Sequence, residues 1–129
     1  MKTQTLFVSL ALTFNLVLAT SAIAAGGKHE HKPMHGGVVV EFKEIDYELV
    51  AKPSLIQLYL RDHGQATDVS KASAKLTLLS GTDKQEIELK PAGDKLEASG
   101  AFKVVSGTKV VALVTIAGKP AGTVRFALK

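Results

Sequence analysis

Short stretches of alternating apolar and polar residues, each followed by turn-forming residues, fill the sequence from Val38 to its end. This alternation has the two-residue period of a β-strand, which places apolar side chains on one face and polar side chains on the other. No stretch after Val38 has the 3.6-residue period of a stable helix. The chain is therefore expected to fold as an all-β domain from Val38 to Lys129.

The expected strands are separated by turn signals about every 8–12 residues, a spacing typical of a sandwich or a small barrel. Lys109 to Ile116 is nearly continuously apolar and β-branched, which predicts a central strand covered on both faces. Cysteine and tryptophan are both absent, so tyrosine and phenylalanine are expected in the core. We predict an antiparallel β-sandwich (immunoglobulin-like in its general class) or a small barrel of about seven strands. A loop is expected at 117–122. The expected strands lie at 38–42, 45–51, 55–61, 74–79, 86–90, an interrupted 96–104, 109–116 and 123–128.

The start of the chain has the organisation of a secretory signal peptide. Lys2 supplies a positive end, Leu6 to Leu18 supplies an apolar stretch, and Ala22-Ile23-Ala24 fits the small-residue cleavage motif. An uncleaved membrane anchor is the alternative, but the apolar stretch is shorter than the roughly 20 residues that span a bilayer. We therefore expect an exported mature chain that does not span a membrane, with three parts in the precursor: a signal peptide at 1–24, a flexible arm at 25–37 and the β-domain at 38–129.

Composition argues against several classes of protein. The net charge is +4, but the lysines are scattered among aspartate and glutamate, whereas a nucleic-acid-binding protein gathers its basic residues into a patch. Because there is no cysteine, neither a disulfide framework nor a thiolate metal site is available. The sequence also lacks a Gly-x-Ser-x-Gly elbow and a glycine-rich phosphate loop, so we expect neither catalytic residues nor an enzyme.

The arm concentrates residues that bind metals. It holds three of the four histidines and the only methionine besides Met1, namely His29, His31, Met34 and His35. Imidazole suits copper, zinc and nickel, and a thioether suits Cu(I), so this set favours copper, with zinc, silver or nickel as alternatives. The spacing matches no established zinc pattern. The competing interpretation is therefore a solvated linker whose histidines bind nothing.

Two further features bear on a metal site. Cleavage after Gly26 would leave His29 third from a free amine, an arrangement that binds Cu(II) or Ni(II) in a square plane. His63 lies in a predicted turn, where the neighbouring Asp62 would orient it as a ligand. If the arm folds back over the loop at 62–68, His63 would join the arm histidines. The alternative for His63 is an exposed turn residue.

Five sequence segments resemble a known group of proteins, and the resemblance extends over nearly the whole chain after the signal peptide. They are HGGVVVE at 35–41, YELVAKP at 47–53, LYLRDHG at 58–64, KPAGDKLE at 90–97 and the tail at 109–129. These runs resemble small exported proteins of Gram-negative bacteria related to a domain of the periplasmic adaptor subunits of heavy-metal (RND-type) efflux pumps. The resemblance implies a periplasmic β-domain associated with heavy-metal or copper resistance, with His35 and His63 as the shared positions that could bind metal. The chain lacks the helical hairpin and lipoyl-like parts of a complete adaptor.

Two functions from different classes are therefore expected. The first is a periplasmic metal-binding protein, with copper favoured, whose ligands are His29, His31, Met34, His35 and His63. The second is a non-catalytic β-sandwich module that docks on an efflux adaptor by an edge strand and binds no metal of its own.

Overall fold

The computed structural model describes residues 32–117 and 119–129, and over these ranges the fold is all-β, as expected. The signal peptide and residues 25–31 of the arm lie outside the described residues. No described segment forms a helix of the length and apolarity needed to cross a membrane. The strands are β1 (Val38–Phe42), β2 (Ile45–Lys52), β3 (Leu55–Asp62), β4 (Gln65–Ala66), β5 (Ser73–Ser80), β6 (Asp83–Ala92), β7 (Lys95–Ser99), β8 (Lys109–Ile116) and β9 (Lys119–Ala127).

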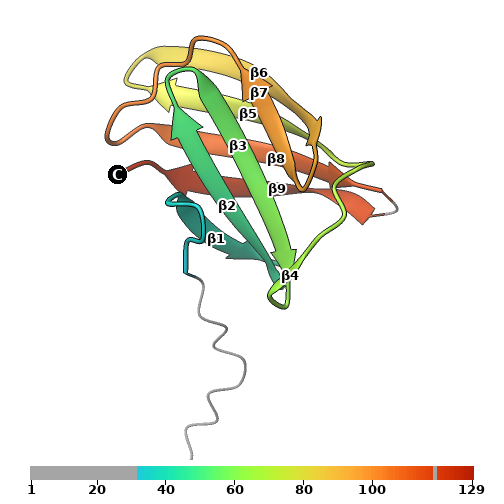
Figure 1. Ribbon diagram of the computed structural model, residues 1–129. Coiled ribbons are helices and arrows are strands. Elements are labelled where there is room, and N and C mark those ends of the chain that lie inside the picture. The colour runs from blue at the N-terminus through green and yellow to red at the C-terminus, as the bar shows by residue number, and fades with distance from the viewer. Residues whose placement is uncertain (1–31, 118) are drawn as a thin grey trace, which may run out of the picture.

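The strands form one antiparallel sheet that curls into a nearly closed barrel. Its order is β1-β2-β3-β7-β6-β5-β8-β9, and β4 pairs only with the end of β3. Figure 1 shows the two end strands, β1 and β9, lying beside each other. They approach so closely that a Cβ atom added at Gly122 of β9 would lie 3.0 Å from the Phe42 ring of β1. We call this junction of the two end strands the β1–β9 seam.

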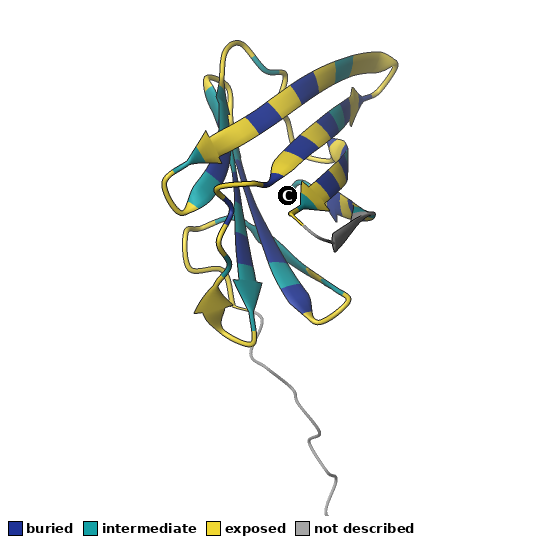
Figure 2. Ribbon diagram, turned by 90° about the vertical axis from the view of Figure 1, so that its right-hand side faces the viewer, coloured by how far each residue is buried: buried dark blue, intermediate teal, exposed yellow. Residues whose placement is uncertain are grey.

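The core fills the inside of this curled sheet. Buried and exposed residues alternate along the strands, as Figure 2 shows. Ile56, Leu58 and Leu60 of β3 are almost fully buried, as the alternation predicts. Tyr47 and Phe126 are the large aromatic side chains within the buried cluster, in keeping with the expectation that tyrosine and phenylalanine fill the core.

Some strand predictions were wrong. In β8, Val110, Ala112 and Val114 are buried but Leu113 is 46% exposed, so this strand is not covered on both faces. Its β-branched and apolar residues suit a strand surface without requiring burial on each side. The loop predicted at 117–122 is also shorter than expected, because β9 begins at Lys119 and pairs with Ile116 there. An end strand tolerates Pro120, whose missing N–H would break a central ladder.

Candidate functional site

The residues just before β1 lie across the outer face of β2 and β3. We call residues 32–37, which belong to the predicted arm, the docked segment. Three of its backbone N–H groups donate hydrogen bonds to the side chain of Glu48 on β2. At its start, the Lys32 carbonyl oxygen accepts a hydrogen bond of 3.1 Å from the Arg61 guanidinium on β3. These hydrogen bonds hold the backbone of Met34 and His35 against the sheet.

Glu48 is the centre of this arrangement. It points to the outer face of the sheet, yet only 1% of its surface is exposed because the docked segment covers it. The Met34 N–H lies 3.0 Å from Oε1, while the N–H groups of His35 and Gly37 lie 2.7 Å and 3.0 Å from Oε2. A buried carboxylate is stable only with such donors.

The pKa of Glu48 reflects this environment. Desolvation by burial raises the pKa of the carboxyl, but the three backbone donors and the nearby His35 lower it, and together they outweigh the burial. The net effect is a pKa below the ordinary value of 4.5, so Glu48 is ionised near neutral pH. The docked segment is thus held by a charged acceptor, which makes stronger hydrogen bonds than a neutral one.

The His35 side chain is held as well. Its imidazole stacks on the Tyr59 ring of β3, with the ring centroids 3.6 Å apart and the planes 11° from parallel. The Lys95 ammonium lies 5.9 Å from the centroid of the Tyr59 ring. Because a stacked ring has few orientations, His35 is presented in a defined position at the surface.

Gly37 allows the docked segment to approach β2 this closely. A Cβ atom at Gly37 would lie 2.3 Å from the Leu49 carbonyl oxygen and 3.0 Å from Val50 Cγ2. Only a residue without a side chain fits there, because the nearest atoms belong to the backbone of the neighbouring strand.

Replacing Gly37 with alanine is therefore expected to lower the free energy of unfolding by about 1–3 kcal/mol, the range for an overpacked site. Thermal unfolding followed by circular dichroism measures the change. Gly36→Asn is the matched control, because Gly36 has open space around it and a φ of 74° that asparagine tolerates. Equal melting temperatures for the two variants would contradict the close approach at Gly37.

A surface hollow of about 250 Å³ opens beside the docked segment. Its walls carry a thioether, an imidazole, a guanidinium and a carboxylate, from Met34, His35, Arg61 and Asp94. Met34 is 67% exposed, which is high for a large apolar side chain and leaves its sulfur accessible. The thioether and the imidazole are the donors that suit a soft cation.

His63 occupies the turn between β3 and β4, as predicted. His63 and Gly64 have φ values of 50° and 80°, the conformation of a two-residue hairpin turn. The ring is 58% exposed; its Nδ1 lies 2.5 Å from Asp62 Oδ1 and its Nε2 lies 3.9 Å from Glu44 Oε2. Asp68, at the end of the loop, accepts a hydrogen bond of 2.9 Å from the Ser70 N–H.

The described structure places His35 and His63 in different surroundings. His35 stacks on Tyr59 of β3, whereas His63 lies in the turn after β3 with its ring against Asp62. Within residues 32–117 and 119–129, no group of three or more histidine or acidic side chains is placed to hold a metal. His29 and His31 lie outside the described residues.

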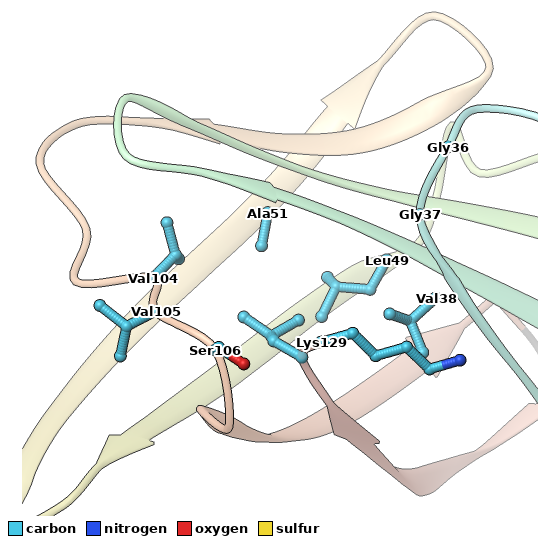
Figure 3. A pocket seen from close by; sticks show the side chains of 10 residues that line it. Gly36, Gly37, Val38, Leu49, Ala51, Val104, Val105, Ser106 and Lys129 are labelled. Atoms are coloured by element: carbon cyan, nitrogen blue, oxygen red, sulfur yellow. The ribbon is translucent and has the colours of Figure 1, made fainter.

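Another hollow, of about 310 Å³, lies where the chain enters β1, close to the C-terminus (Figure 3). Val38, Leu49, Val104 and Lys129 contribute to its lining. Among the described residues that line it there is no histidine, methionine or acidic side chain, and the donors that suit a soft cation are therefore not found in this lining.

Sequence reasoning missed Glu48 and Tyr59. The alternation of the sequence places both on the outer face of their strands, where side chains ordinarily meet solvent. The available signal was Val50, an apolar residue on the same outer face of β2 as Glu48, together with Gly36 and Gly37 just upstream. An apolar residue on an otherwise polar face indicates that something covers that face.

Comparisons with known proteins leave this site without an assignment. No family model matches the sequence, and no curated protein matches it. One solved structure, the crystal structure of a bromine derivative of the carbohydrate-binding module BhCBM56, matches 70% of this chain and 99% of its own. The TM-score is 0.42 and the identity 9%, a likeness that carries no argument about this chain.

Proposed function

We propose that this chain is a periplasmic metal-binding protein that captures a soft or borderline cation, with copper favoured. The observation that supports this most is the fixed presentation of Met34 beside His35 at the edge of an open hollow. A thioether next to an imidazole, with no thiolate, suits Cu(I) and its analogue Ag(I). Zinc and nickel remain alternatives through the imidazoles.

In this proposal both the folded part and the arm supply metal ligands. Met34 and His35 supply two donors from the surface of β2 and β3, and His29 and His31 supply the others from the preceding residues. His63 lies in the turn that follows β3, where its ring contacts Asp62, and is assigned to a separate position. Ligands at the surface exchange with a partner without opening the core, which suits delivery to an efflux adaptor in the periplasm.

The second candidate is a non-catalytic interaction module that docks on an efflux adaptor. The observation that favours it is that β1 and β9 end the order of hydrogen-bonded strands in the described sheet. An end strand offers unpaired backbone groups to another chain. Under this candidate the arm histidines bind nothing.

Isothermal titration of the mature protein with Ag(I), Cu(II) and Zn(II) at neutral pH tests the proposal. We expect saturable binding of Ag(I), together with a shift of the Met34 methyl signal and the His35 ring signals in NMR spectra. Affinity for each ion should fall as the pH drops through about 6.5, because metal binding requires neutral imidazole. A folded protein that gives no heat above buffer with any of the three ions would reject metal binding and leave the interaction module.

A further inference from the structure

The β1–β9 seam contains a third hollow, which is lined by core residues and not by the docked segment. Its volume is about 270 Å³, and it reaches the inner face of the barrel between the end of β1 and the end of β8. Most of its walls are apolar, and the residues that form them are Phe42, Ile45, Val114, Ile116 and Gly122.

Tyr47 adds a polar group to these walls. The residue is 4% exposed and lines the hollow. Burial raises the pKa of Tyr47 above its ordinary value of 10.0, so the phenol keeps its proton and remains a donor. A ligand in the hollow can supply an acceptor for this donor.

Lys43 contributes a positive charge to the hollow. It lies in the turn after β1 and lines the same hollow, with its ammonium 5.4 Å from the centroid of the Phe42 ring. Among the described residues that line the hollow, none is acidic. An apolar space with a phenol donor and a cationic edge is complementary to a molecule with an apolar body and an anionic head.

The volume limits the size of that molecule. A cavity of about 150 Å³ holds benzene, whereas pockets for drug-sized ligands begin at about 300 Å³. The hollow at the seam falls between these values. It therefore suits a medium-chain fatty acid or a small aromatic acid rather than a long lipid.

We propose that the hollow at the β1–β9 seam binds small amphipathic carboxylates, with the apolar body between Phe42, Val114 and Ile116 and the carboxylate directed to Tyr47 and Lys43. This site is separate from the docked segment and does not rest on metal binding. Failure of either proposal leaves the other intact.

Titration of the folded protein with octanoate and, separately, with 2-naphthoate tests the proposal and distinguishes an aliphatic from an aromatic ligand. We expect saturable shifts of the methyl signals of Ile45, Val114 and Ile116 in NMR spectra with at least one of the two acids. The uncharged alcohol 1-octanol should bind more weakly than octanoate, because it leaves the Lys43 ammonium without a counter-charge.

Two variants test the polar groups, and neither removes core volume. Tyr47→Phe should weaken carboxylate binding about fivefold, the effect of losing one hydrogen bond. Lys43→Gln should weaken it about twofold to fivefold, as expected for an exposed ion pair, and should remove the preference for octanoate over octanol. Tyr59→Phe is the matched control, because Tyr59 lies on the outer face, and it should bind like the unaltered protein.

Several results would overturn the proposal. One is the absence of saturable shifts at the seam residues with both acids, in protein shown to be folded. Another is a response confined to exposed apolar residues elsewhere, such as Leu79 or Leu113. Equal affinity in Tyr47→Phe, Lys43→Gln and Tyr59→Phe would also reject the assigned roles of the phenol and the ammonium.

Discussion

Replacing Glu48 with glutamine is expected to lower the free energy of unfolding by about 2 kcal/mol at pH 7, because charge-assisted hydrogen bonds are lost from a buried position. An amide has one oxygen and presents N–H groups to the backbone donors that now meet the second carboxylate oxygen. For a domain of this size the melting temperature should fall by about 10 °C. The docked segment should also be released, which hydrogen exchange at Met34, His35 and Gly37 would detect.

The stabilisation that the Glu48 carboxylate provides should decrease as the pH falls. Because the folded-state pKa of Glu48 lies below its ordinary value of 4.5, its contribution to stability is complete above that value. The contribution is lost as the pH falls through the folded-state pKa, so the difference between the unaltered protein and Glu48→Gln should shrink in acid. Glu88→Gln is the matched control, since Glu88 lies exposed on β6 and should give almost no change. A Glu48→Gln protein as stable as Glu88→Gln at pH 7 would contradict the role of the carboxylate.

The strands were predictable because their determinants are local. The alternation in β2 and β3 identifies which side chains face the core, and Leu49, Leu58 and Leu60 are buried accordingly. Closure of the sheet was not predictable in the same way. The close approach of Phe42 and Gly122 depends on the twist accumulated over the whole sheet. That twist cannot be predicted from any short stretch of the sequence.

The candidate site was predictable only in part. Met34 and His35 stand out by residue type, and their metal-binding role is still a prediction. Their support by Glu48 joins residues 11 to 14 positions apart through backbone N–H groups, which every residue except proline carries. Such contacts leave no pattern in the sequence. The same holds for the stacking of His35 on Tyr59, which only the folded register brings about.

Replacing His29, His31 and His35 together with alanine should lower the affinity for Ag(I) and Cu(II) by about 100-fold or more. Loss of a residue that merely supports a ligand already weakens metal binding by about 10–100-fold, and here the ligands themselves are removed. The fold should persist, because all three donors to Glu48 are backbone N–H groups, which alanine retains. The melting temperature of the triple variant should therefore stay close to that of the unaltered protein, with only the stacking on Tyr59 lost.

Two single variants make the metal-binding result specific. His63→Ala should leave the affinity for each ion unchanged, because the ring of His63 is held beside Asp62 and Glu44 in the β3–β4 turn and not beside His35. Met34→Leu should weaken Ag(I) binding much more than Zn(II) binding, since it removes the soft thioether and keeps a similar volume. If His63→Ala abolished binding while the triple variant kept it, the metal site would lie at the β3–β4 turn. The docked segment would then have no part in metal capture.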